Sequence, residues 1–271
     1  MKAITRLTAA LLIILLTPGI KLAAQSFSKS IDIVEASAIT GLSSGSFIVV
    51  DDERGIFYLN PNLEAELLLA AEQHSFLNDL EGVALSPDKK QIYFLSEKGG
   101  SISLAEISDS SGKIVLGTPQ IIGNLPQIGE ESNKGWEGIC TTVLGNRSIL
   151  LAAHQEKPKA IAMFELPSLK LISMCKLPEE LKNLLKNLSD ICVDDRTGHI
   201  LLLSGKSARV VEIKAKITDQ IDEIDIISIT NLKGNLSGRP EGLCFDSNER
   251  LVVVTDGAGE PGTFIRLNTK K

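Results

Sequence analysis

A four-residue motif that recurs five times constrains the fold of this 271-residue chain more than any other feature. The motif begins with Ser or Glu, and its first residues are 44, 56, 52 and 52 positions apart. A period near 50 residues with several strands per copy is typical of a β-propeller, because one copy cannot bury its own hydrophobic faces and must pack against the next around a common axis. The copies are Ser37-Ala38-Ile39-Thr40, Glu81-Gly82-Val83-Ala84, Glu137-Gly138-Ile139-Cys140, Ser189-Asp190-Ile191-Cys192 and Glu241-Gly242-Leu243-Cys244.

The strand pattern within each copy completes this interpretation. Alternating or β-branched runs follow each motif, separated by turns such as Ser86-Pro87-Asp88, but the fifth copy ends one strand short. Ser28–Val34 precedes the first motif and has the pattern of a strand. The sequence therefore predicts an all-β, five-bladed β-propeller over residues 25–271, in which the N-terminal strand completes the last blade and removes an exposed sheet edge. Leucines at helical spacing predict a helix within Pro178–Leu188, beside the third and fourth blades.

The N-terminal segment has the pattern of an export signal. Lys2 and Arg6 precede an apolar stretch from Leu7 to Leu16, and small residues before Gln25 offer a cleavage site. The stretch is shorter than the roughly 20 apolar residues that a spanning helix needs. We expect residues 1–24 to be a signal peptide and the chain to be exported, to the periplasm or beyond. The alternative is an inner-membrane anchor formed by residues 7–24.

Charge and composition exclude some partners. Removing residues 1–24 takes away three basic residues and no acidic one, so the net charge changes from −6 to −9. A nucleic-acid-binding protein needs a basic footprint, so this class is not expected. The negative net charge is consistent with an exported monomer that binds a cation.

The cysteines also follow the repeat. Cys140, Cys192 and Cys244 all lie three residues after the first residue of a motif, where the other copies have Thr40 and Ala84. All five side chains are small, which suits a crowded position near the axis. We expect free thiols that pack between blades, rather than disulfides.

The motif glutamates are the candidate site. Glu81, Glu137 and Glu241 begin the predicted innermost strands, so radial packing brings three carboxylates toward one axis, where they repel one another. A bound divalent cation resolves this conflict, and oxygen ligands at irregular spacing favour Ca²⁺ over Mg²⁺. Ser37 and Ser189 occupy the same position in their copies and could contribute hydroxyl groups. The other interpretation is that each Glu caps backbone amides at a channel mouth.

A second set of acidic residues follows the second strand of each copy, except that the fourth copy has Gly205 there. These residues would lie at one rim of the channel, as a second shell around the ion or as charged turn residues. They are Asp52, Glu97, Gln155 or Glu156, and Asp256.

The motifs resemble a known family. The segments EASAIT, DLEGVAL, NKGWEGIC, NLSDICVDDRTGHILLLS and RPEGLCFD are similar to those of the SdiA-regulated propellers, which are distantly similar to NHL-repeat proteins. The resemblance covers nearly all of residues 30–267. It implies a five-bladed propeller with a bound Ca²⁺ in an exported or membrane-associated bacterial protein. Asp190, where the family has Gly, and Gly205, where it has an acid, depart from the pattern and put the fourth blade's part in any site in doubt.

Two functions follow from these observations. The first is a Ca²⁺-binding, non-enzymatic propeller that recognises an unidentified envelope protein or small ligand. The alternative is a metal-dependent hydrolase of the lactonase or phosphoesterase type, which needs a general base beside the ion. His154 is the credible catalytic histidine, but a packing role is the competing interpretation, and no catalytic residue can be assigned from the sequence.

Overall fold

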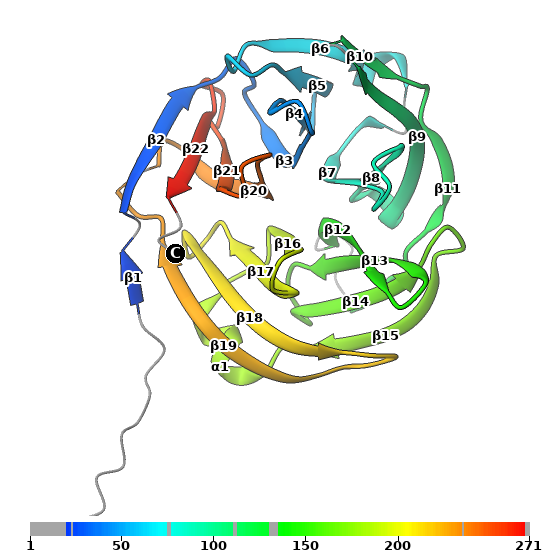
Figure 1. Ribbon diagram of the computed structural model, residues 1–271, viewed down its shortest axis with the longest axis vertical. Coiled ribbons are helices and arrows are strands. Elements are labelled where there is room, and N and C mark those ends of the chain that lie inside the picture. Colours follow the sequence, from blue (N-terminus) through cyan, green and yellow to red (C-terminus); the bar gives the residue numbers. More distant parts are fainter. Residues whose placement is uncertain are drawn as a thin grey trace, which may run out of the picture.

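The computed structural model describes residues 20–22, 24–74, 77–110, 113–129, 135–234 and 236–268. They form five sheets arranged radially (Figure 1). The expected leader lies mostly outside these residues. Among the described residues, no helix is long and apolar enough to span a membrane.

The first three sheets are blades one to three, each starting with its innermost strand. Blade one contains β3 (Ala36–Gly41), β4 (Phe47–Asp51), β5 (Gly55–Leu59) and β6 (Ala65–Ala70), followed by the short helix η1 (Ala71–Gln73). Blade two contains β7 (Leu80–Leu85), β8 (Gln91–Ser96), β9 (Ser101–Ser110), β10 (Lys113–Leu116) and β11 (Gln120–Asn124), with η3 (Lys98–Gly100) between β8 and β9. Blade three contains β12 (Trp136–Leu144), β13 (Arg147–His154), β14 (Ala160–Glu165) and β15 (Lys170–Lys176).

Blades four and five share the N-terminal segment. Blade four contains β16 (Asp190–Asp194), β17 (His199–Ser204), β18 (Arg209–Ile217) and β19 (Ile221–Asn231), with β1 (Ile20–Leu22) parallel to β19. Blade five contains β20 (Arg239–Phe245), β21 (Leu251–Asp256), β22 (Thr263–Asn268) and β2 (Ala24–Ser30). β2 is outermost and antiparallel to β22, with Ser28 opposite Ile265. It begins and ends four residues earlier than the strand expected at Ser28–Val34.

Blade two also differs from the expected four strands. β9 spans ten residues, and its two halves have different partners. Its first half pairs with β11, whereas its second half pairs with β10 as a hairpin. β10 is not among the strands expected from the sequence, and its pairing with β9 defines it as a strand.

The innermost strands form the ring that positions the site. β3, β7, β12, β16 and β20 contact one another in that order, and β20 contacts β3. They surround the centre of the molecule in Figure 1. Because all five run in the same direction along the channel, the first residues of the motifs lie at one mouth and the last residues toward the other.

The hydrophobic core lies between neighbouring blades. Five clusters of buried side chains fill the five interfaces. Cys140 packs in the cluster of blades three and four, Cys192 in that of blades four and five, and Cys244 in that of blades five and one. All four cysteines are free thiols. The structure confirms that this column packs small side chains where blades converge.

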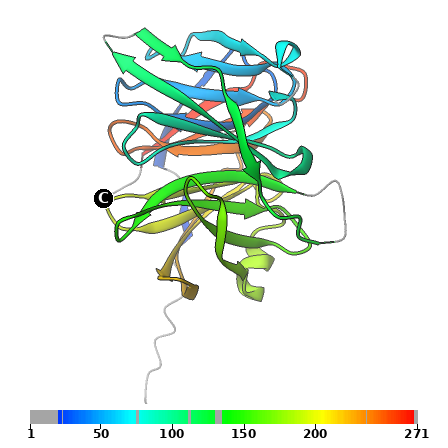
Figure 2. The same ribbon diagram turned by 90° about the vertical axis from the view of Figure 1, so that its right-hand side faces the viewer.

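The predicted helix is α1 (Glu179–Leu184), visible from the side in Figure 2. Leu181 is buried, and so are Leu185 and Leu188 just after the helix. All three lie in the cluster between blades three and four, with Ile161 and Ile213. The helix therefore covers the edge of that interface, as its leucine spacing predicts.

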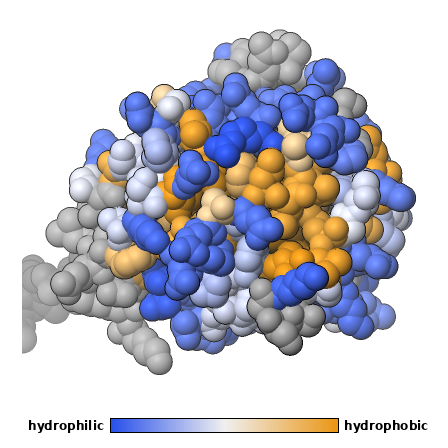
Figure 3. All heavy atoms as spheres, turned by 90° about the horizontal axis from the view of Figure 1, so that it is seen from above, coloured by the Kyte–Doolittle hydropathy of each residue, from blue (hydrophilic) through white to orange (hydrophobic). Residues whose placement is uncertain are grey.

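The outer surface of blades one and two carries exposed apolar side chains. Leu67 of β6 is 46% exposed and Val115 of β10 is 55% exposed. β6 and β10 lie at the top of Figure 1, so they are on the face seen in Figure 3, where apolar residues form a continuous patch. Leu68, Leu69, Ile114 and Leu116 connect this surface to the cluster between the two blades.

Candidate metal centre at the channel mouth

The first residues of the five motifs lie where the innermost strands begin, at one mouth of the channel. Ser37, Glu137, Ser189 and Glu241 are buried, and Glu81 is half-buried. Their carboxylates are close enough to affect one another: Glu137 and Glu241 both raise the pKa of Glu81. We refer to this end of the channel as the acidic mouth. The acidic rim residue Glu97 belongs to the same mouth.

Blade two supplies the tightest group of carboxylates. Asp79, Glu81 and Glu97 each have an oxygen within 4.8 Å of the others. Asp79 and Glu81 lie two residues apart around the start of β7, and Glu97 follows β8, the neighbouring strand. The backbone fixes this arrangement, because the amide of Glu97 donates to the carbonyl of Asp79 at 2.9 Å. Among the described residues, no other group of three potential metal ligands is as compact.

The remaining motif glutamates surround this group without joining it. Burial raises the pKa of Glu137 well above its usual range, and the neighbouring Glu97 and Glu241 raise it further. Burial also raises the pKa of Glu81 well above its usual range, and the negative charge of Glu137 raises it further. Burial also raises the pKa of Glu97, although the amide of Gly135 donates to its Oε1 at 3.1 Å. Burial and mutual repulsion therefore both disfavour the ionised form of the carboxyl groups at the acidic mouth.

Among the described residues, the basic side chains that form ion pairs with acids at this mouth belong to blades four and five. Arg239 forms an ion pair with Glu241 and approaches Asp256 at 3.8 Å, and Lys206 forms an ion pair with Glu156. Burial raises the pKa of Glu241 to about 7, even though Arg239 and the hydroxyl of Ser189 lower it. Among the described residues, Asp79, Glu81, Glu97 and Glu137 form no ion pair with Lys or Arg. The unbalanced charge is therefore concentrated at blades two and three.

Asp52 extends the acidic surface toward blade one. Burial raises its pKa to about 7, and Glu35 raises it further. Its Oδ1 is buried and has no hydrogen-bond partner among the described residues. A buried carboxylate oxygen without a partner is costly, so this atom indicates a missing proton or cation at the same mouth.

The two motif serines have other hydrogen bonds. The Ser37 hydroxyl donates to the carbonyl of Glu35 at 3.2 Å. The Ser189 oxygen accepts from the side-chain amide of Asn187 at 3.0 Å and from the amide of Gly205 at 3.1 Å. Gly205 has no room for the acid found in other blades, because a β-carbon there would lie 2.8 Å from the Pro240 carbonyl oxygen. The fourth blade thus supports the mouth through hydrogen bonds.

His154 packs within blade three. Its side chain is 2% exposed, its Nδ1 lies 2.8 Å from the Pro158 carbonyl oxygen, and its ring meets that of Trp136 edge-on with centroids 5.2 Å apart. Burial lowers its pKa. These contacts favour the packing role over that of a general base.

Asp79 is the residue that sequence reasoning missed. It lies two residues before the Glu81 motif, and the equivalent positions in the other copies are mostly polar. A polar residue at the same position in most copies is a signal that could have identified it. The column comprises Glu35, Asp79, Gly135, Asn187 and Arg239.

Fold and site define a five-bladed β-propeller with an acidic channel mouth. The sequence matches the model of the SdiA-regulated family over residues 29–268. The chain therefore belongs to the SdiA-regulated family, as its motifs suggested. None of the curated proteins matches it in sequence.

Solved structures show the same fold in proteins of varied chemistry. Glutaminyl cyclase of Myxococcus xanthus is 16% identical, with a TM-score of 0.57 over 94% of this chain and 100% of that one. The PQQ-bound aldose sugar dehydrogenase of Streptomyces coelicolor is 14% identical, with a TM-score of 0.52 over 90% of this chain and 99% of that one. A chain of a nidogen/laminin complex is 11% identical, with a TM-score of 0.52 over 81% of this chain and 72% of that one. At these identities the likeness concerns the fold alone.

Proposed function

We propose that this protein is an exported Ca²⁺-binding propeller whose ion sits at Asp79, Glu81 and Glu97. The main support is that one carboxylate oxygen from each of the three residues lies within 4.8 Å of the other two. Ca²⁺ binds oxygens at about 2.3–2.6 Å, so two ligands of one ion lie at most about 5 Å apart. The spacing of the three carboxylates therefore suits a shared ion, with Glu137 as the next acidic neighbour.

The charge balance supports a cation independently of this spacing. The three side chains form no ion pair with Lys or Arg among the described residues, and burial raises the pKa of Glu81 and Glu97. The orphaned Asp52 oxygen lies in the same acidic surface, since Asp52 is one of the groups that raise the pKa of Glu81. A divalent cation would offset this repulsion without requiring protonation.

The ligand chemistry favours Ca²⁺ over Mg²⁺. All three groups offer carboxylate oxygens, which hard cations prefer, and no histidine or cysteine belongs to the group. Ca²⁺ accepts flexible and irregular ligand geometry, whereas Mg²⁺ demands a near-ideal octahedron.

We further propose that the ion organises the acidic mouth for recognition of an envelope protein or a small ligand. A hydrolase would need a general base beside the ion, and His154 is occupied by packing contacts. The recognition function rests on the expected export of the chain and on the acidic mouth.

Metal titration of chelator-stripped protein tests the ion site. Trp136 is the sole tryptophan and follows Gly135, whose amide donates to Glu97. Tb³⁺ bound at the cluster should therefore show luminescence sensitised by this indole, and Ca²⁺ should displace it. Ca²⁺ at a hundredfold excess over Kd should also stabilise the fold by about 2.7 kcal/mol and raise the melting temperature.

Variants locate the ion within the mouth. Asp79→Asn and Glu81→Gln should each abolish most of the sensitised luminescence and of the Ca²⁺-induced rise in melting temperature. Glu106→Gln, an exposed position on β9, is the matched control and should retain both. Equal melting temperatures with and without Ca²⁺ would instead assign the carboxylates to backbone capping and proton sharing.

A further inference from the structure

The opposite end of the channel contains a cavity of about 750 Å³. It is lined by the last residues of the five innermost strands and by the turns that follow them. Ligand pockets in proteins have volumes of about 300–1,000 Å³. Because the innermost strands begin at the acidic mouth and end here, this cavity is separate from the proposed ion site.

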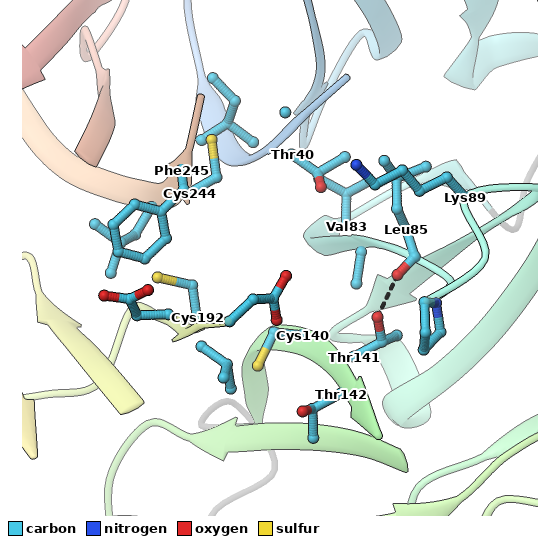
Figure 4. Close-up of a pocket in the computed structure, with 18 of the residues that line it drawn as sticks. Thr40, Val83, Leu85, Lys89, Cys140, Thr141, Thr142, Cys192, Cys244 and Phe245 are labelled. Carbon is cyan, nitrogen blue, oxygen red and sulfur yellow. Dashed lines mark hydrogen bonds between the residues drawn. The ribbon is translucent and has the colours of Figure 1, made fainter. Parts of the chain in front are cut away.

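Part of the cavity wall is apolar, and the three motif cysteines belong to this part. Cys140, Cys192 and Cys244 line it and are 8%, 7% and 6% exposed. Burial raises the pKa of each thiol well above its usual range, so all three stay protonated at neutral pH. Figure 4 shows the three cysteines around the centre, with Phe245 and Leu85 on different sides. The wall therefore suits an apolar side chain.

Most charges around the cavity are already matched. Arg196 forms ion pairs with Asp194 at 2.9 Å and with Glu249 at 3.4 Å. Asp246 lies 2.9 Å from both Arg250 and Arg266. These pairs leave little net charge on this part of the lining.

Two lining residues have unmatched charges of opposite sign. Among the described residues, neither the Lys89 ammonium nor the Asp195 carboxylate forms an ion pair. The adjacent Asp88 instead accepts at its Oδ1 from the Ser86 hydroxyl at 2.6 Å and from the Lys90 amide at 3.2 Å. Lys89 belongs to blade two and Asp195 to blade four, which are not adjacent. In Figure 4 the Lys89 side chain extends toward Thr40.

We propose that this cavity binds a small zwitterion with an apolar side chain, namely a free amino acid or a short peptide. Its carboxylate would pair with Lys89 and its ammonium group with Asp195. The apolar side chain would lie against Leu85, Phe245 and the thiols. This site does not depend on the metal site, so either proposal can fail alone.

Calorimetry with capped and uncapped ligands tests the charge pairing. The probes are leucine, Leu-Leu and N-acetyl-Leu-Leu-amide, which keeps the side chains but carries no charge. At least one of the two zwitterions should bind saturably, and which one binds separates an amino-acid site from a peptide site. The capped peptide should bind about tenfold or more weakly than the better zwitterion, since a hydrogen bond to a charged group contributes at least this factor.

Substitutions assign the two ends of the ligand. Lys89→Gln and Asp195→Asn should each weaken binding of the zwitterion about tenfold. The neighbouring exposed Lys90→Gln and the distant exposed Asp32→Asn are the matched controls and should bind as the unsubstituted protein does. Unchanged affinity in both cavity variants, or equal affinity for the capped peptide, would overturn the proposal.

The thiols give a second measurement that requires no substitution. Because a maleimide reacts with the thiolate and the pKa of each thiol is raised, modification is followed at mildly alkaline pH, where a bound zwitterion should slow the reaction of Cys140, Cys192 and Cys244. Cys175 lies on β15, outside the cavity, and should react at the same rate with and without ligand. Absence of binding by either zwitterion, or binding that leaves all four rates unchanged, would place the ligand elsewhere and refute the assignment.

Discussion

At the scale of single residues, a buried carboxylate connects blades four and five. Asp190 is 2% exposed, and it accepts from the Ile191 amide at 2.8 Å and from the Leu243 amide of β20 at 2.6 Å. Burial raises its pKa well above the usual range, although both hydrogen bonds lower it. A β-carbon at position 138 would lie 2.5 Å from the Cα of Asp190. Gly138 therefore provides the space in which this unusual motif residue fits.

Substitution of Asp190 should reveal the strength of this connection. Each oxygen of Asp190 accepts from one backbone amide. Asp190→Asn replaces one of these oxygens with an NH₂ group, which cannot accept, so one buried amide loses its partner. We expect the free energy of unfolding to fall by about 1–3 kcal/mol, measured by urea denaturation. Exposed Asp32→Asn is the control. Equal stability of the two variants would show that water or a rearranged backbone replaces the lost acceptor.

At the scale of secondary-structure elements, the N-terminal strand occupies the outer edge of blade five. β2 pairs with β22 through residues 24 and 27–30, with Ser30 opposite Thr263. Immediately after the strand, Ile31 and Ile33 are buried in the cluster between blades five and one. The segment thus contributes backbone pairing at the edge and apolar side chains to an interface.

Deletion of residues 25–30 separates these two contributions. It removes the strand but keeps Ile31 and Ile33, so the edge of β22 should become exposed and promote association between chains. We expect a lower melting temperature and higher-order species in size-exclusion chromatography. Ser28→Ala, which keeps the backbone ladder, should behave as the unsubstituted chain does. A deleted chain that stays monomeric and melts normally would contradict a stabilising role for β2.

At the scale of the whole molecule, stability comes from the five interfaces between blades. Each cluster joins side chains from two neighbouring blades, and Cys140, Cys192 and Cys244 contribute to three of them. The thiols are free, so no covalent bond between these cysteines supports the ring. The closed arrangement buries every innermost strand between two neighbours.

Reducing agents should therefore have no effect on stability. We expect the same melting temperature with and without a thiol reductant, because packing and not disulfide bonding holds the blades together. Mass spectrometry of the non-reduced protein should find four free thiols. A disulfide between any two cysteines would refute this expectation.

The sequence by itself determined the repeat, the number of blades and the packing role of the cysteine column. These properties depend on local signals: strand alternation, turn residues such as Ser86-Pro87-Asp88, and one motif that recurs at a regular interval. The leucine spacing of α1 is equally local. Each signal can be read without knowing which residues meet in space.

Only the tertiary structure decided how charge is distributed at the acidic mouth. Three equivalent glutamates suggested one axial site, yet Arg239 engages Glu241, and Glu81 gathers with Asp79 and Glu97. The directions of long side chains depend on neighbours from other blades, and a repeat pattern does not contain this information. The same holds for the thiol-lined cavity, since it exists only where five separate strands end around a common axis.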